Sequence, residues 1–279
     1  MVTKFRYSQA NFQDFQDCHR RFFLRYIRKL AWPAVESQPV QKNEIFREQG
    51  VSFHRMIQQY FLGIPEETLS SLNLDDPLHG WWQNFIESKM NLPAIHHPQA
   101  RIFPEYTLNT DLGKHRLSAK FDLLVVLDNQ ITIFDWKTSH RRPEIRFLEK
   151  RLQSIVYPFL AARSGPYLLQ DKVGFQPENI KLFYWFAEFP DQPIILSYSQ
   201  KKMESDYQYL LSISNEIENL GAIGEEAFTL TQEEKMCDFC VYRSLCNRGI
   251  SAGIHTIMED FDAANNLTFD LDQIDEIEF

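Results

Sequence analysis

The chain has 279 residues, of which 44% are hydrophobic, 14% aromatic and 24% charged, and its formal net charge is -9. This balance is typical of a folded globular protein and excludes a disordered chain. No run of about 18 or more apolar residues is present, which excludes a membrane-spanning helix. The first residues mix charged and amide side chains without the apolar core of a secretion signal, so we expect a cytoplasmic protein whose thiols stay reduced.

Hydrophobic periodicity and turn residues predict helices and strands in a mixed order. Helices are predicted over 11–28, 43–61, 144–163 and 201–219, the first of them capped by Ser8. Strands are predicted over 101–109, 116–127, 130–135, 180–189 and 194–198. We interpret 61–100, with one short helix near 81–89, as a helical insertion. This order indicates an α/β fold with a mixed central sheet flanked by helices and an N-terminal helical region.

We interpret residues 1–257 as a single domain and 258–279 as a disordered tail. The tail holds eight acids and no base, and removing these eight charges from -9 leaves -1. A negative total therefore does not exclude a polyanionic substrate, because the basic stretches 19–29 and 140–151 lie elsewhere. We expect the tail either to dock a protein partner or to compete with DNA for a basic groove.

Two carboxylates and a lysine on neighbouring strands are predicted to crowd one end of an apolar sheet. Residues two apart in a strand point to the same face, so Asp135 and Lys137 project together. The turn at 128–129 places Asp122 and Asp135 as near cross-strand neighbours. A divalent cation would compensate these charges, and Mg²⁺ and Mn²⁺ prefer such oxygen ligands. The alternative is a buried Asp–Lys ion pair beside an exposed second aspartate.

Four short motifs surround this cluster, and their order resembles the PD-(D/E)XK nuclease superfamily, in particular its RecB-like and Cas4-like branch. In that branch a Gly-x-x-x-His helix motif precedes a strand Asp, an Asp-x-Lys strand and a helical Gln-x-x-x-Tyr. The matching residues here are Gly50 with His54, Asp122, Asp135 with Lys137, and Gln153 with Tyr157. The chain departs from the family at 119–121, where Ala-Lys-Phe stands near a position that is often glycine.

The resemblance implies a restriction-endonuclease-like core that hydrolyses phosphodiester bonds with Mg²⁺ or Mn²⁺. It implies as metal ligands the side chains of His54, Asp122 and Asp135 and the backbone carbonyl of Trp136. It further implies that Lys137 orients or polarises the attacking water. By the same resemblance, Gln153 and Tyr157 line the active site and contact the scissile strand.

Several of these residues have ordinary roles when they are considered without the resemblance. An isolated histidine such as His54 is more often structural than a metal ligand. Gln153 and Tyr157, four apart on one helix face, are equally typical of core or surface positions. Glu105, on the strand before Asp122, is either an additional acid near the metals or a surface residue of an edge strand.

The cysteines form a second candidate site. Cys237, Cys240 and Cys246 follow a Cys-x-x-Cys-x5-Cys pattern, and Cys18 is the one remaining cysteine. Four thiols complete a tetrahedral S4 set, which binds either zinc or an iron–sulfur cluster. The resemblance to Cas4-like and AddB-like nucleases implies a [4Fe–4S] cluster rather than zinc. Such a cluster would staple the N-terminal helix to the segment 237–246.

We therefore expect a metal-dependent DNA nuclease, which the family suggests is a single-strand or end-directed exonuclease. The candidates for phosphate contacts are Arg20, Arg21, Arg25, Arg141, Arg142 and Arg146. A Gly-x-x-x-x-Gly-Lys-Ser/Thr loop is missing, so the chain is not itself an ATP-driven motor. It acts alone or with a partner such as a helicase. The alternatives are a non-catalytic or partner-dependent DNA-end-binding or CRISPR-adaptation subunit, a zinc-stapled adaptor, and an RNA substrate.

Overall fold

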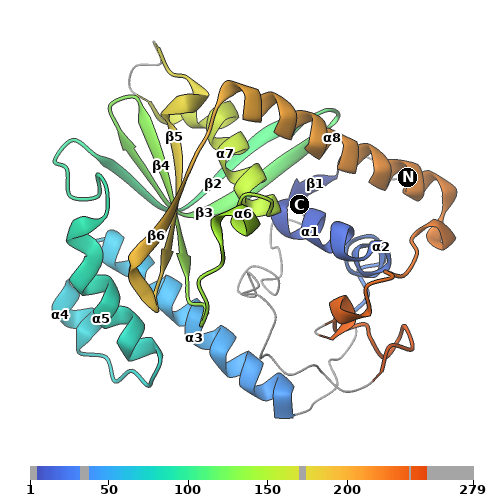
Figure 1. Ribbon diagram of the computed structural model, residues 1–279, viewed down its shortest axis with the longest axis horizontal. Helices are drawn as coiled ribbons and strands as arrows, with labels where there is room; N and C mark the ends of the chain where they lie inside the picture. Colours follow the sequence, from blue (N-terminus) through green and yellow to red (C-terminus); the bar gives the residue numbers. More distant parts are fainter. Residues whose placement is uncertain (1–4, 32–37, 170–173, 239, 250–279) are drawn as a thin grey trace, which may run out of the picture.

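The computed structural model describes residues 5–31, 38–169, 174–238 and 240–249, so the predicted tail 258–279 lies outside the described residues (Figure 1). The strands are β1 (Arg6–Ser8), β2 (Arg101–Leu112), β3 (His115–Leu127), β4 (Gln130–Lys137), β5 (Ile180–Phe186) and β6 (Phe189–Ser197). The helices are α1 (Gln9–Asp17), α2 (His19–Phe22), α3 (Gln38–Phe61), α4 (Glu66–Ser70), α5 (Leu78–Ser88), α6 (Ile145–Leu148), α7 (Leu152–Ser164) and α8 (Gln200–Ile223). Among these, no helix combines the length and apolar character of a membrane span.

The described strands form one mixed sheet of six strands in the order β1-β3-β4-β5-β6, with β2 also paired to β3. The strands β2, β3 and β4 make an antiparallel meander, and β5 then runs parallel to β4. Parallel neighbours need a crossover connection, which α6 and α7 provide here. The predicted α/β fold with a mixed central sheet flanked by helices is thereby confirmed.

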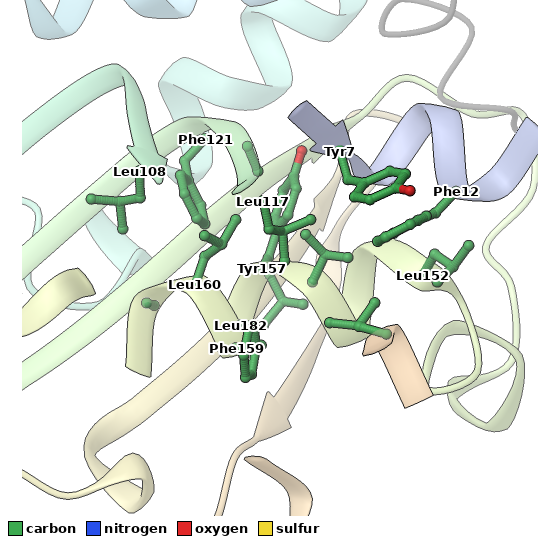
Figure 2. Close-up of a cluster of buried hydrophobic side chains, with 14 of the residues drawn as sticks. Tyr7, Phe12, Leu108, Leu117, Phe121, Leu152, Tyr157, Phe159, Leu160 and Leu182 are labelled. Atoms are coloured by element: carbon green, nitrogen blue, oxygen red, sulfur yellow. The ribbon is translucent and has the colours of Figure 1, made fainter. Parts of the chain in front are cut away.

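Each face of the sheet carries its own hydrophobic core, because successive strand residues point to opposite faces. On one face, α1, α7 and α8 pack against side chains such as Phe121 and Leu124 (Figure 2). On the other face, α3 and α5 pack against Leu123 and Trp136. The sheet is therefore buried on both sides, and the polar groups at the end of β4 lie between two helical layers.

The segment predicted as an insertion contributes to the second core. Its helix α5 buries Trp81, Trp82 and Phe85 almost completely, and the ring of Phe85 lies against Trp136 and Trp185 of the sheet. Its function in the fold is therefore to cover one face of the sheet and to support α3.

Several predicted boundaries were wrong, among them the start of the helix predicted over 43–61, which begins at Gln38, and the start of the strand predicted over 194–198, which begins at Phe189. The helix predicted over 11–28 is broken at Cys18, whose backbone is extended (φ -166°, ψ 111°), and continues as α2 and a π-helical turn, Phe23–Ile27. The helix predicted over 144–163 is interrupted between α6 and α7. The strand predicted over 180–189 ends at Phe186, and β6 begins at Phe189. Strand β1, which the prediction missed, has only three residues, too few for a recognisable alternation.

We expect the substitution Trp82→Ala to reduce the free energy of unfolding by about 3–5 kcal/mol. Trp82 is fully buried, and its Nε1–H donates a hydrogen bond to Ser70 Oγ at 2.9 Å, so truncation would leave both a cavity and an unpaired hydroxyl. Urea unfolding monitored by circular dichroism measures the change. Leu62→Ala, at a position that is 65% exposed, is the matched control and should change stability little. A loss below about 1 kcal/mol would contradict a core role for α5.

Candidate active site

A close approach of α3 to the sheet positions His54. Gly50 lies one turn before His54, and a Cβ at Gly50 would sit 3.2 Å from Thr138 Oγ1, just beyond the end of β4. A contact this short favours glycine, because any larger residue would push the helix and the strand end apart. The Gly-x-x-x-His spacing thus brings the imidazole of His54 next to Asp122 of β3, beside the end of β4.

Asp122 on β3 links His54 to β4. Its Oδ1 lies 3.3 Å from His54 Nδ1, and its Oδ2 accepts a hydrogen bond from the backbone N–H of Trp136 at 2.9 Å. Leu123 pairs with Phe134 across the hairpin, so the register puts Asp122 at the level of Asp135. The side chain of Trp136, in contrast, is buried in the second core.

Glu105 on β2 completes a three-residue group. Its neighbours Pro104 and Tyr106 pair with Leu123 and Phe121, so Glu105 lies opposite Asp122. Its backbone has a φ of 51°, an uncommon value for a residue other than glycine. One ligand atom each from His54, Glu105 and Asp122 lies within 4.8 Å of the other two, and the described residues contain no other such group of His, Cys, Asp or Glu. Of the two roles open to Glu105, this position favours the acid near the metals.

Asp135, Lys137 and Gln153 form a buried polar triangle beside this group. The Lys137 ammonium lies 2.8 Å from Asp135 Oδ2 and donates a hydrogen bond to Gln153 Oε1 at 2.9 Å. Gln153 Nε2 in turn donates to Asp135 Oδ1. The side-chain carboxamide of Gln153 therefore bonds to both charged groups and fixes their positions. Asp135 is not a member of the three-residue group, and its role as a metal ligand stays a prediction.

Tyr157 lies one helical turn beyond Gln153 on α7. Its hydroxyl donates a hydrogen bond to the carbonyl of Lys120 at 3.3 Å, and its ring packs 4.8 Å from that of Phe121. The ammonium of Lys120 lies 2.6 Å from Glu105 Oε2. Tyr157 is thus tied to the strand that carries Asp122, and its predicted contact with substrate stays a prediction.

The charges of the three-residue group depend on one another. Burial alone would lower the pKa of His54, but the adjacent carboxylate of Asp122 outweighs it and raises the pKa to about 9. For Asp122, burial alone would raise the pKa. The charge of the His54 imidazolium outweighs burial, so the pKa of Asp122 is lowered. Burial and the Asp122 charge raise the pKa of Glu105. Without metal, the His54 imidazolium therefore stabilises the carboxylate of Asp122, while Lys120 pairs with Glu105.

This pairing predicts a pH dependence for the metal-free protein. The pKa of His54 is higher in the folded state, about 9, than in the unfolded chain, about 6.5, so the folded state binds the proton more tightly. The stabilisation is fully present below pH 6.5 and is lost as the pH rises through 9, a change of about 3 kcal/mol. Urea unfolding in the presence of a chelator, from pH 6 to pH 9, measures it. His54→Gln should remove this part of the slope, and equal slopes in the two proteins would contradict the ion pair.

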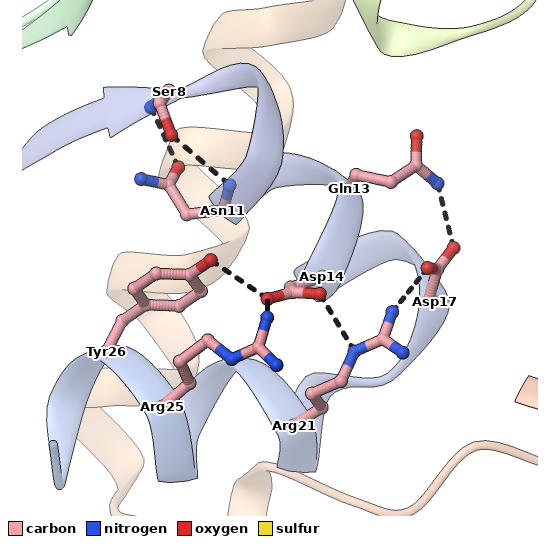
Figure 3. Close-up of polar contacts among 8 residues, drawn as sticks. All are labelled: Ser8, Asn11, Gln13, Asp14, Asp17, Arg21, Arg25 and Tyr26. Atoms are coloured by element: carbon pink, nitrogen blue, oxygen red, sulfur yellow. Dashed lines mark hydrogen bonds and ion pairs between the residues drawn. The ribbon is translucent and has the colours of Figure 1, made fainter. Parts of the chain in front are cut away.

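The first three arginines predicted to contact phosphate have protein partners. Arg21 and Arg25 pair with the buried carboxylate of Asp14 at 2.9 Å and 2.7 Å (Figure 3). Arg20 lies 2.8 Å from Glu225. For these residues a role in the fold is therefore established, and their contact with DNA stays a prediction.

The arginines that follow β4 are more accessible. The Nε–H of Arg142 donates a hydrogen bond to the carbonyl of Gln192 at 2.7 Å, and Arg146 pairs with Glu144 at 2.6 Å. Arg141 and Arg146 are both exposed. They are free to reorient toward a phosphate backbone at little cost, since exposed ion pairs contribute little to stability.

All four cysteines are free thiols that lie in one region of the molecule. Burial raises the pKa of Cys237 and of Cys246, and both Cys240 and Cys18 raise it further, which places Cys18 beside the C-terminal three. The break of the N-terminal helix at Cys18 puts this thiol at the junction between α1 and α2. The fold therefore brings together residues that are more than 200 positions apart.

Two solved structures are distantly similar to this chain. The crystal structure of SSO0001 has 12% sequence identity and a TM-score of 0.41, covering 88% of this chain and 86% of that chain. A protein from Eubacterium rectale named "Putative exonuclease" has 8% identity and a TM-score of 0.48, covering 76% of this chain and 79% of that chain. Likenesses at this level carry no argument about function. None of the curated proteins matches the sequence.

The family comparison also covers most of the chain. The model of the PD-(D/E)XK nuclease superfamily matches residues 6–247, which include β1 through β6, the three-residue group and the four cysteines. The Asp-x-Lys strand and the acid on its neighbouring strand both lie within the matched residues. This chain therefore belongs to the PD-(D/E)XK nuclease superfamily.

Proposed function

We propose that this protein is a divalent-metal-dependent DNA nuclease that hydrolyses phosphodiester bonds. The observation that carries the proposal is the convergence of His54, Glu105 and Asp122 from three separate elements to within 4.8 Å, beside the buried Lys137. Two carboxylates and one imidazole form a donor set that suits Mg²⁺ or Mn²⁺. Asp135 and the carbonyl of Trp136 are further candidate ligands by the family resemblance.

A bound divalent ion would stabilise charge on the scissile phosphate and generate a hydroxide from a bound water. The residues of the chain have separate tasks around it. One carboxylate oxygen of Asp122 contacts the imidazole of His54, and the other accepts a hydrogen bond from the β4 backbone. These two contacts fix the positions of Asp122 and His54. Lys137, oriented by Asp135 and Gln153, would place its ammonium next to the attacking water. Because these partners are already in place, little reorganisation is needed when substrate binds.

The substrate and direction of cleavage are finer proposals that rest on the resemblance. We expect single-stranded DNA or DNA ends, with Arg141, Arg142 and Arg146 near the phosphates. A helicase or a CRISPR-adaptation complex would be the partner that supplies such ends, and the acidic tail is a candidate docking segment. The free thiols agree with a reducing compartment such as the cytoplasm.

Cleavage of end-labelled single- and double-stranded DNA tests the proposal. The protein, purified anaerobically, should cut in Mg²⁺ or Mn²⁺ and not in a chelator, and the product ladder will distinguish an exonuclease from an endonuclease. Tight binding of DNA ends without cleavage in either metal would instead support the non-catalytic end-binding subunit.

We also infer that Cys18, Cys237, Cys240 and Cys246 bind a [4Fe–4S] cluster. The four thiols are free and adjacent, so their donor chemistry fits an S4 site. An S4 donor set suits zinc and an iron–sulfur cluster alike, and the family resemblance is what favours the cluster. Iron and acid-labile sulfide near four per chain would support the cluster; zinc without iron would contradict it.

A further inference from the structure

A buried carboxylate organises the N-terminal helices. Asp14 is 2% exposed, and it receives Arg21 Nε at 2.9 Å, Arg25 Nη1 at 2.7 Å and the hydroxyl of Tyr26 at 2.9 Å (Figure 3). Arg21 also pairs with Asp17. We call Asp14, Arg21, Arg25 and Tyr26 the Asp14 network. Its two guanidinium groups are only 12% and 21% exposed, which is unusual for groups whose task is to meet DNA.

The Asp14 network lies against the cysteines from both ends of the chain. On the N-terminal side, the backbone N–H of Cys18 donates to the carbonyl of Asp14 at 3.0 Å, and Arg21 follows Cys18 by three residues. On the C-terminal side, burial raises the pKa of the Cys240 thiol, while the charges of Arg21 and Arg25 oppose that rise. The network therefore lies next to the first thiol and next to the most buried one.

A third buried arginine lies in the same region. Arg243 is 4% exposed, and its Nη1–H donates to the carbonyl of Cys240 at 3.3 Å. Buried cations are costly unless an anion compensates them. Asp14 and Asp17 already pair with Arg21 and Arg25. Three largely buried guanidinium groups therefore lie close to the thiols, where they would interact favourably with a negatively charged cofactor.

We propose that the Asp14 network is a charge-compensating support for the cysteine-bound iron–sulfur cofactor, which retains the cluster and sets its reduction potential. This inference rests on the proposed cluster and gives Arg21 and Arg25 a role other than DNA contact. They act as positioning residues, through the electric field and the packing around the thiolates. Reduction adds negative charge to the cluster, so a nearby cation raises the reduction potential and a nearby anion lowers it.

Opposite substitutions in the network provide the test. Redox titration of the purified holoprotein, followed by electron paramagnetic resonance, should show a lower potential in Arg21→Gln and a higher potential in Asp14→Asn. Arg21→Lys, which keeps the charge, should stay near the wild type. Arg28→Gln is the control, because Arg28 is 61% exposed and pairs with Glu225 outside the network. A purely structural role would move both variants in the same direction and would overturn the inference, as would two unchanged potentials.

Iron release to a chelator provides a second readout if a variant holds too little cluster for titration. Arg21→Gln should lose iron about tenfold faster than the wild type, and Arg21→Lys should be close to it. Equal rates for Arg21→Gln and Arg28→Gln would contradict the role in retention. A wild-type protein with zinc and no iron would overturn the cluster assignment itself, whereas an iron-containing wild type with unresponsive variants would overturn the network alone.

Discussion

Lys137→Ala should slow DNA cleavage by about 100- to 10,000-fold while DNA binding changes little. The ammonium of Lys137 is held between Asp135 and Gln153 next to the proposed metal ligands, and it is only 7% exposed. Its removal would take away the group that we propose to orient the attacking water. Single-turnover cleavage of end-labelled DNA measures the rate, and fluorescence anisotropy with Ca²⁺ in place of Mg²⁺ measures binding.

The same substitution also removes half of a buried ion pair, which typically costs 3–5 kcal/mol of stability. Lys137→Met, which preserves most of the volume, should therefore be compared with Lys137→Ala, and thermal unfolding should establish that both variants are folded. Lys150→Ala, at an exposed position before α7, is the control and should cleave at the wild-type rate. A folded Lys137 variant with at least half of the wild-type rate would exclude the lysine from catalysis.

Asp122→Asn should abolish cleavage and weaken Mn²⁺ binding by at least about 100-fold. The reason is that Asp122 would offer a carboxylate to the proposed metal and also contacts His54, and loss of a residue that only orients a metal ligand already costs about 10- to 100-fold in affinity. Asparagine can still accept the hydrogen bond from the Trp136 N–H, so the strand pairing should survive. Isothermal titration with Mn²⁺ measures the affinity.

Glu105→Gln distinguishes the two roles that the sequence left open for Glu105. As a metal ligand it should weaken Mn²⁺ binding, although less than Asp122→Asn, because its carboxylate is shared with Lys120. Asp111→Asn, on the same strand and with a side chain that is 82% exposed, is the matched control. A wild-type affinity for Mn²⁺ in Glu105→Gln would support the role as a surface residue. A wild-type affinity for Mn²⁺ in Asp122→Asn would contradict the metal centre as a whole.

The sequence by itself was sufficient for the elements around the Asp-x-Lys strand. Alternation of apolar residues marks β3 and β4, and the turn at 128–129 determines their register, so the levels of Asp122 and Asp135 follow from local geometry. The α/β class follows from the order of these elements. The Cys-x-x-Cys-x5-Cys pattern likewise identifies a candidate cofactor site without any knowledge of the fold.

Only the tertiary structure decided which distant residues meet. The sequence left two roles open for Glu105, an acid near the metals or an edge-strand surface residue, and the pairing of β2 with β3 sets it opposite Asp122. Arg21 and Arg25 looked like a basic surface, yet the break at Cys18 folds α2 back so that both arginines reach the buried Asp14. Periodicity and turns report which face a residue occupies within its own element. The partner of a charged side chain depends instead on the packing of elements far apart in the chain, which no local pattern encodes.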